Sequence, residues 1–449
     1  MLFSVFPISG ISSDSTATGW EQVPGILSDI IPPTFPANDF SIIEYGGVGD
    51  GSTDCTTAFA QAIQACSEAG GGRVVIPQGI FLTGAIHLKS NVNLHLTKNS
   101  TILFSTDPQK YLPVVYTRFE GVECMNYSPF IYAYDEENIA ITGSGTLDGQ
   151  AGEHAWWPWK GRSKDGSPSQ DRDREELFRM GEEGIPVADR VFGENHYLRP
   201  NFIQPYKCRN ILIDSVTIKR SPMWEIHPVL SENVTVQNVR ISSHGPNNDG
   251  CDPESSKDVL IKNSYFDTGD DCIAIKSGRN ADGRRVNEPS ENIIVQGCTM
   301  KDGHGGVVIG SEMSGNVRNV FVEDCAMDSP NLERALRIKT NSMRGGIVEN
   351  IYMRNVTVGQ VSDAVVKINF NYGEGDVGQH LPVVRDIYVS NVTSRKSRYG
   401  ISLEGYKRSP VTSFHLEDCR FDGVMDGNLL RYYKNLVMKN VYINGQLQN

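Results

Sequence analysis

A short motif recurs along this chain, and no other sequence feature restricts the fold as strongly. Each copy starts with Asn, Asp or Ser and continues with an apolar, an arbitrary and an apolar residue, which is the period-two pattern of a half-buried strand. Copies start at Asn138, Asn210, Asn233, Asp258, Asn292, Asn319, Asn350, Asp386, Ser413 and Asn435. From residue 210 the intervals are 22 to 36 residues. Such intervals are too short for a propeller blade or a βαβ unit each time, so we expect a solenoid of stacked strands.

The motif predicts an all-β fold, a right-handed parallel β-helix in which each coil buries apolar side chains against its neighbours. Five Val and Cys residues recur at equivalent inward positions: Val239, Cys298, Cys325, Val356 and Cys419. The nine cysteines are scattered singly and include no C-x-x-C pair. We therefore interpret most of them as small buried hydrophobes and expect neither a disulfide framework nor a zinc ribbon.

The N-terminal segment has the features of a cap on such a solenoid. Asp54 is a candidate N-cap for a helix that runs to about Ala69, with Phe59, Ile63 and Cys66 on one face. Residues 1–38 are rich in Ser, Thr and Pro and predict an extended N-terminal arm. We expect residues 39–449 to form a single β-helix domain closed by this short helix.

The spacing between Asn138 and Asn210 exceeds one coil, which predicts a loop insertion at about 152–200. This segment contains Trp-Trp-Pro-Trp at 156–159 and the charged run 171–176. We interpret the run as a solvated helix face. The tryptophans fit sugar stacking and loop packing equally well.

Charge and hydropathy exclude some partners. With 42 Lys+Arg against 54 Asp+Glu, the net charge is −12, so we expect no nucleic-acid partner held by bulk charge. No run of eighteen apolar residues occurs, so we expect no membrane span. The first basic residue is Arg73, so no signal peptide is evident. A cytoplasmic protein and a secreted or periplasmic one with its signal removed both fit, and the oligomeric state is open.

Ionisable residues recur at a similar distance from successive motifs. Asp249 follows Asn233 by 16 residues, and Asp270 and Asp271 follow Asp258 by 12 and 13. His304 and Arg337 follow their own motifs by 12 and 18. We expect these side chains on the strand after the motif strand, in a row that lines a groove along the solenoid axis.

The types of residue in this row indicate glycoside hydrolysis. Three close carboxylates cannot all ionise freely, so at least one pKa should be raised, and an acid beside a base can cleave a glycosidic bond. A calcium site or a solvated turn would also explain the acids, and His304 would ordinarily be a turn residue. Arg337 and Lys339 alternate on one strand face and would bind a carboxylate, which indicates an acidic sugar.

Four motifs in this order resemble the polygalacturonases, glycoside hydrolase family 28. They are Asn247-Asn248-Asp249, where the family has Asn-Thr-Asp, then Gly269-Asp270-Asp271, Gly303-His304-Gly305 and Arg337-Ile338-Lys339. The resemblance covers about residues 40–449, and the likeness is greatest to bacterial exo-polygalacturonases. It implies the pectin-lyase-like type of β-helix.

The resemblance also implies roles for single residues. Asp270 would be the general acid, and Asp249 and Asp271 would deprotonate the attacking water in an inverting displacement. His304 would support the proton state of the acid. The substrate-binding residues would be Asn247, Arg337, Lys339 and Tyr372, with uronate on the leaving side. No metal or cofactor is implied.

We therefore expect an exo-acting hydrolase that removes galacturonate from the non-reducing end of pectate or oligogalacturonides, with the insertion closing one end of the groove. The alternatives are an endo-polygalacturonase and a rhamnogalacturonan or xylogalacturonan hydrolase. A pectate lyase would use calcium and a cationic base, which fits these acids less well. A non-catalytic β-helix binder would have no use for all four motifs at one phase.

Overall fold

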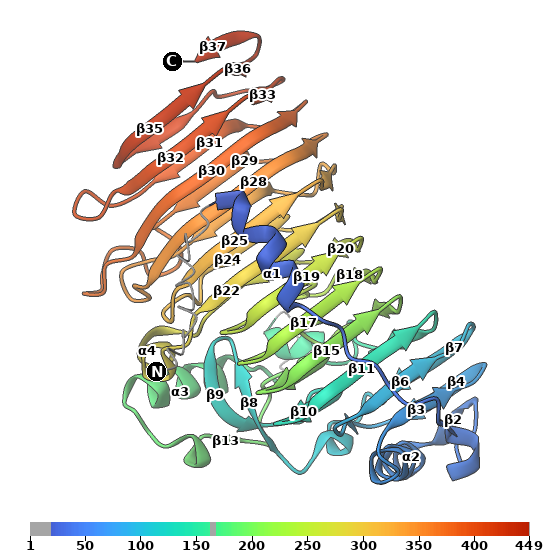
Figure 1. The fold of residues 1–449 in the computed structure, drawn as a ribbon. Coiled ribbons are helices and arrows are strands. Elements are labelled where there is room, and N and C mark those ends of the chain that lie inside the picture. The colour runs from blue at the N-terminus through green and yellow to red at the C-terminus, as the bar shows by residue number, and fades with distance from the viewer. Residues whose placement is uncertain (1–18, 162–167, 449) are drawn as a thin grey trace, which may run out of the picture.

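The strands of the protein stack as parallel coils along one axis (Figure 1). The computed structural model describes residues 19–161 and 168–448. Nearly every strand pairs in parallel with the strand one coil away, as β15 (Arg209–Asp214) does with β17 (Glu232–Gln237). The predicted parallel β-helix is confirmed.

Each coil contributes strands to three faces. The first face contains β1 (Asp39–Ser41), β3 (Gly72–Ile76), β6 (Val92–Leu96), β11 (Glu137–Gly143), β15, β17, β19 (Lys257–Lys262), β22 (Ser290–Gln296), β25 (Val317–Glu323), β28 (Ile347–Val358), β30 (Val383–Ser394), β32 (Val411–Glu417) and β35 (Tyr433–Lys439). The second contains β2 (Asp50–Asp54), β4 (Gly79–Thr83), β7 (Ser100–Phe104), β12 (Thr146–Asp148), β16 (Thr217–Lys219), β18 (Arg240–Ser243), β20 (Tyr265–Thr268), β23 (Thr299–Met300), β26 (Ala326–Met327), the ends of β28 and β30, β33 (Arg420–Phe421) and β36 (Val441–Ile443), closed by antiparallel β37 (Gln446–Gln448).

The third face forms the floor of the groove described below. It contains β5 (Ile86–His87), β10 (Ile131–Tyr134), β14 (Ile203–Tyr206), β21 (Ile273–Ile275), β24 (Val307–Gly310), β27 (Arg334–Lys339), β29 (Ala364–Asn369), β31 (Tyr399–Glu404) and β34 (Leu429–Arg431). Between β14 and β21 the stack continues through single bridges at Ile226 and Cys251.

The first residue of each repeat motif takes a left-handed backbone conformation. At all ten positions φ lies between 53° and 58°, where Asn and Asp are tolerated far better than other L-residues. The side chains also bond from coil to coil: Asn210 Nδ2 donates to Asn138 Oδ1 at 2.9 Å, and Asn233 Nδ2 donates to Asn210 Oδ1 at 2.8 Å. All ten motifs lie in first-face strands, as predicted.

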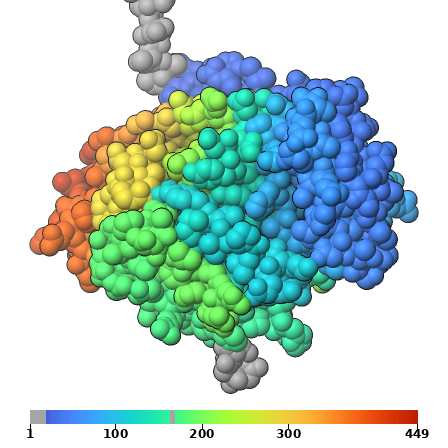
Figure 2. All heavy atoms as spheres, turned by 90° about the horizontal axis from the view of Figure 1, so that it is seen from below, coloured from blue at the N-terminus to red at the C-terminus, as the bar shows by residue number. Residues whose placement is uncertain are grey.

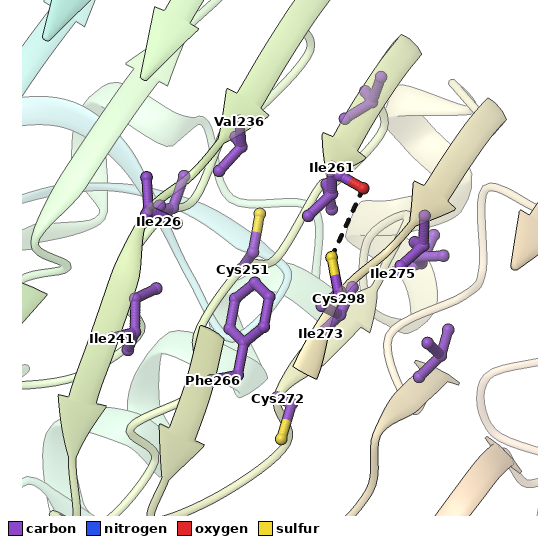
Figure 3. Close-up of a cluster of buried hydrophobic side chains, with 14 of the residues drawn as sticks. Ile226, Val236, Ile241, Cys251, Ile261, Phe266, Cys272, Ile273, Ile275 and Cys298 are labelled. Atoms are coloured by element: carbon purple, nitrogen blue, oxygen red, sulfur yellow. Dashed lines mark hydrogen bonds between the residues drawn. The ribbon is translucent and has the colours of Figure 1, made fainter. Parts of the chain in front are cut away.

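Apolar side chains fill the interior of the coils. Figure 3 shows Cys251, Cys272 and Cys298 among Ile and Val side chains of neighbouring coils. The five inward residues predicted from the repeat are each at most 2 % exposed. All nine cysteines are buried free thiols, so their interpretation as small hydrophobes is confirmed.

Helix α2 (Thr56–Glu68) covers the N-terminal end of the solenoid and buries Phe59, Ile63 and Cys66 as predicted (Figures 1 and 2). The predicted N-cap, Asp54, is wrong by one residue, because Cys55 occupies the N-cap position and the helix begins at Thr56. The carboxylate of Asp54 still accepts a bond from the backbone N–H of Thr56, at 2.9 Å.

The expectation of an extended N-terminal arm is wrong for residues 19–29, which are helical, whereas residues 30–38 form no helix or strand. The turn η1 (Gly19–Gln22) and helix α1 (Val23–Asp29) lie across the outside of the first face (Figure 1). Apolar side chains from the two partners form a separate core: Val23, Ile26, Ile30, Leu260, Ile294, Phe321 and Tyr352. Outward apolar residues on the first face thus provide the reason for the helix to dock. Residues 1–18 lie outside the described residues.

The predicted insertion is present between β12 and β14. It contains η4 (Trp157–Lys160), α3 (Asp171–Glu182), η5 (Val187–Asp189) and β13 (Val191–Phe192). It packs on a hairpin that the sequence did not predict, β8 (Val115–Phe119) with β9 (Val122–Asn126), and α3 contacts α4 (Asn280–Val286). The short turns η2 (Ile42–Tyr45) and η3 (Pro108–Tyr111) complete the elements.

The tryptophans of the insertion pack against the core, which favours loop packing over sugar stacking. The charged run forms the start of α3, but it is only partly solvated, because Asp173 is buried. No helix among the described residues is long and apolar enough to cross a membrane.

Candidate active site

A polar cavity of about 780 Å³ opens where the insertion faces the third sheet face. It collects the candidate residues Asn247, Asp249, Asp270, His304, Arg337, Lys339 and Tyr372, and Asp271 lies directly behind the lining. Its remaining charged lining residues are Glu120, Lys160, Arg174, Lys276, Arg279, Glu312, Glu333, Arg344 and Glu374. The structure therefore brings all eight sequence-predicted site residues to one place.

The row of ionisable groups lies one strand later than predicted. We expected it on the strand after each motif strand, but those strands, such as β18 and β20, form the second face. Asp270 and Asp271 instead come just before β21, and His304 just before β24, at the start of third-face strands. The coil has three strands rather than two, and the second-face strands are too short to show a clear alternation in the sequence.

The three aspartates form a tight cluster. Asp249, Asp270 and Asp271 each have a carboxylate oxygen within 4.8 Å of the others. Asp249 is 2 % exposed and Asp271 is fully buried, whereas 17 % of the Asp270 side chain is open to the cleft. Coil spacing explains the closeness: at Gly269 an added Cβ would lie 2.4 Å from the carbonyl oxygen of Gly245, so only glycine allows this approach.

Cations surround the buried carboxylates. Lys339 Nζ lies 2.6 Å from Asp271 Oδ2, and Arg337 Nη1 lies 3.6 Å from Asp271 Oδ1. Lys276 Nζ lies 3.6 Å from Asp249 Oδ2. A divalent cation placed on these oxygens would meet ammonium groups at close range, so the charges argue against the calcium interpretation of the acids.

Protons are distributed unequally within the cluster. Burial, with Asp270 nearby, raises the pKa of Asp249 well above its ordinary range, as the sequence led us to expect for one carboxyl. Burial of Asp270 acts in the same direction, but its bond with His304 outweighs it and lowers the pKa of Asp270 to about 2. That bond joins His304 Nδ1 and Asp270 Oδ1 at 2.8 Å and raises the pKa of His304 to about 9.

The turn that carries Asp249 is held by Asn248, the residue that departs from the family pattern. Its Oδ1 accepts from the backbone N–H of Gly245 at 2.8 Å, and its Nδ2 donates to the carbonyl of Ser221 at 3.0 Å. Its Nδ2 also donates to the carbonyl of Met223 at 3.2 Å, whereas a threonine hydroxyl has one proton and could donate to only one of these carbonyls.

Arg199 fixes the neighbouring Asn247 from the insertion side. This fully buried guanidinium donates to Asn247 Oδ1 at 2.7 Å and to Gln170 Oε1 at 2.9 Å. It also donates to the carbonyl oxygens of Pro222 and Pro246, both at 2.8 Å. Arg199 therefore ties the insertion to the turn that carries the catalytic candidates.

Sequence reasoning missed the wall on the far side of the cleft. Lys276 contacts both Asp249 and Glu312 and lies 4.4 Å from the centre of the Trp224 ring. Lys276 lies two residues after Ala274 and directly follows the strand that comes after the acidic pair. A lysine at this place in the sequence is a signal that could have identified it. Arg279, Glu312, Arg344 and Glu374 follow third-face strands in irregular loops, where no sequence period marks them.

A carboxylate cluster in a cleft along a parallel β-helix is an arrangement suited to the glycosidases that act on polysaccharides. The family model "Glycosyl hydrolases family 28" matches residues 193–440, which is more than half of the chain. This protein belongs to that family.

The individual proteins that are similar to this chain include polygalacturonases. A probable polygalacturonase of Vitis vinifera is 30 % identical over 392 residues, which are 84 % of this chain and 72 % of the relative. An exo-poly-alpha-D-galacturonosidase of Dickeya chrysanthemi is 27 % identical over 83 % of this chain, which spans only 62 % of that protein. The crystal structure of an exopolygalacturonase from Thermotoga maritima superposes with a TM-score of 0.93 at 49 % identity, covering 96 % of this chain and 97 % of that one.

Proposed function

We propose that this glycosidase hydrolyses the α-1,4 bonds of galacturonan and releases galacturonate from the non-reducing end. The observation that carries this proposal is the cluster of Asp249, Asp270 and Asp271 beside Arg337 and Lys339 in one cleft. The acids fit glycosidic cleavage and the cations fit a uronate. The 49 % identity to an exopolygalacturonase supports both the substrate class and the exo mode.

In this mechanism Asp270 is the general acid and His304 is its proton store. Below about pH 9 the pair holds one exchangeable proton, which rests on His304 in the free protein. When sugar displaces water from the cleft, the loss of solvation favours the neutral pair, and the proton moves to Asp270. Asp270 has the most exposed side chain of the three acids, so it donates this proton to the leaving oxygen.

Water attacks between the two buried carboxylates. Their oxygens lie within 4.8 Å of Asp270, closer than the roughly 6.5–9.5 Å of most inverting glycosidases. Asp249 and Asp271 are nevertheless 2 % and 0 % exposed, so neither carboxylate is open enough for direct attack on the sugar. A water held against them, which passes a proton to one of these two carboxylates as it attacks, is the remaining nucleophile, which gives inversion. Arg337, Lys339 and Tyr372 bind the uronate on the leaving side, and Asn247 lines the same cleft next to Asp249.

Product analysis tests the proposal. With an oligogalacturonide ladder, we expect galacturonate to appear first, and proton NMR should show the β-anomer as the initial product. The viscosity of polygalacturonate should fall slowly relative to monomer release. A rapid viscosity drop would contradict the exo mode, and an unsaturated product absorbing near-ultraviolet light would indicate a lyase instead.

A further inference from the structure

Lys160 is a cation of the cleft that has no anionic partner among the described residues. It ends the turn η4 of the insertion, lines the cavity and is partly buried. Burial lowers the pKa of Lys160, against the opposing charge of Glu120. Within residues 19–161 and 168–448, no carboxylate oxygen lies within 4.0 Å of its ammonium group, whereas the cleft residue Arg174 pairs with Glu120 at 2.6 Å. A desolvated, unpaired cation in a cleft is a site for an anion.

The nearby Glu120 has one free oxygen. Its Oε2 accepts two bonds from Arg174, at 2.8 Å and 2.6 Å, while its buried Oε1 has no partner among the described residues. The influence of Arg174 overcomes burial and lowers the pKa of Glu120, so this oxygen is an ionised acceptor. The end of the cleft thus offers one free cation and one free hydrogen-bond acceptor.

The turn that carries Lys160 is fixed at the N-terminal end of the catalytic row. Trp157 Nε1 donates to the carbonyl of Ser221, one coil before Asp249, at 2.8 Å. Arg337 and Lys339 lie in β27, on the opposite side of the acids along the axis. If these two bind the leaving side of the cut, Lys160 faces the sugar on the non-reducing side.

We propose that Lys160 and Glu120 form an end pocket for the terminal galacturonate. Lys160 binds its carboxylate, and Glu120 Oε1 accepts a hydrogen bond from its free 4-hydroxyl. In an internal residue of an α-1,4 chain the sugar oxygen at position 4 belongs to a glycosidic bond and carries no proton. It cannot donate a hydrogen bond to Glu120, so Glu120 selects a chain end. The inference rests on the proposed function and adds to it the residues that recognise the charge and the free end of the substrate.

A pair of substrates tests the charge-reading role. Trigalacturonate is compared with the same trimer methyl-esterified only at its non-reducing terminal carboxyl, for the wild type, Lys160→Gln and the exposed-lysine control Lys396→Gln. We expect the wild type and control to prefer the free acid about ten-fold or more in kcat/KM. Lys160→Gln should raise KM for the acid about ten-fold, barely change the ester, and bring the ratio near one.

The outcomes separate the end pocket from the proposed function. If Lys160→Gln lowers kcat/KM equally for both trimers, or leaves both unchanged, Lys160 does not read the terminal carboxylate. If the wild type releases no galacturonate from either trimer, the proposed function fails. Calorimetric titration of galacturonic acid and its methyl ester then tests the pocket alone: selective binding of the acid, lost in Lys160→Gln, supports it, and equal binding overturns it. Thermal unfolding of each variant checks that it is folded.

Discussion

The three aspartates of the site differ in how deeply they are buried, and Asp270 also shares a proton with His304. Asp249 and Asp271 are held inside the wall, each beside a lysine, while Asp270 alone is partly open. In the proposed mechanism the environment, rather than the residue type, separates the one acid from the two water-holding carboxylates. Predictions at this scale concern the donor and its proton store.

The variant Asp270→Asn tests the donor. An amide keeps the size and the bond to His304 but cannot deliver a proton to a leaving oxygen. We expect kcat to fall by about 10²–10⁴-fold, measured by release of reducing sugar. The control is Asp135→Asn, an exposed residue with φ of 56° that Asn tolerates. Hydrolysis near the wild-type rate in Asp270→Asn would rule out Asp270 as the acid.

A second prediction concerns pH. The bond to Asp270 raises the pKa of His304 from 6.5 to about 9, so the pair's contribution to stability is full below pH 6.5 and is lost as pH rises through 9. Activity should follow the same proton. We expect kcat/KM to fall above about pH 9, and this limb should be absent in His304→Gln.

Both pH effects can be measured with one control. The exposed His380→Gln should keep the wild-type pH profile and pH-dependent stability. If His304→Gln retains the limb near pH 9, another group supplies the proton.

The repeat motif acts at the scale of the strand. Its first residue turns the backbone into the left-handed region, and its side chain joins neighbouring coils. Asn319, with φ of 56°, donates to Asn292 and accepts from Asn350, both at 3.2 Å. The motif therefore combines a conformational and a hydrogen-bonding role.

Two variants at Asn319 separate these roles. Asn319→Gly loses the side-chain bonds but keeps the backbone relaxed. Asn319→Ala loses both, so it should be less stable than the glycine variant by about 1–2 kcal/mol. Chemical denaturation followed by circular dichroism measures the difference. Equal stability of the two variants would mean that the left-handed backbone is not a constraint there.

Helix α1 extends the core outside the coils. Ile26 is 8 % exposed and packs with Phe321 and Ile294 on the first face. Ile26→Ala should lower the free energy of unfolding of this helix, by about 2 kcal/mol, and increase proteolysis within residues 19–30. Specific activity should not change, since α1 lies outside the cleft. The exposed Asp29→Asn serves as control, and equal proteolysis of both variants would contradict docking through Ile26.

At the scale of the whole molecule, charge is distributed unevenly. Residues 276–344 hold ten Lys+Arg against nine Asp+Glu, a net charge of +1. The rest of the chain therefore has a net charge of −13, which gives the total of −12. A protein repelled by a polyanion in bulk can therefore bind one uronate at a time in its cleft.

We infer that residues 39–449 form one domain, because a single cluster of buried side chains runs from Ile42 to Ile443.

This distribution predicts an unusual salt response. Repulsion between the −12 protein and polygalacturonate acts over long distances and is screened at about 0.1 M salt, whereas contacts inside the cleft are screened less. Raising ionic strength from about 0.01 M to 0.1 M should increase kcat/KM for the polymer relative to trigalacturonate. Initial rates at several salt concentrations measure this ratio, and a ratio that falls with salt would show that attraction dominates.

Much of the fold and site follows from local patterns. The alternation after Asn210 and its repeats predicts the strands, and the inward cysteines such as Cys298 follow from the same period. Asp270, His304 and Arg337 were found because they recur relative to that period. The docking of α1 was not predictable, since its partners Leu260 and Phe321 are apolar on a face that the period marks as outward.

The sequence by itself determined the solenoid and the residues of its groove, because both depend on neighbours within one strand or on a repeated interval. Only the tertiary structure decided on which face the groove lies, that burial raises the pKa of Asp249 while the bond to His304 lowers that of Asp270, and that Lys160 lines the same cleft without an anionic partner among the described residues. Those properties depend on desolvation and on charges from segments far apart in the chain, such as the insertion and β27, and the fold alone brings these together.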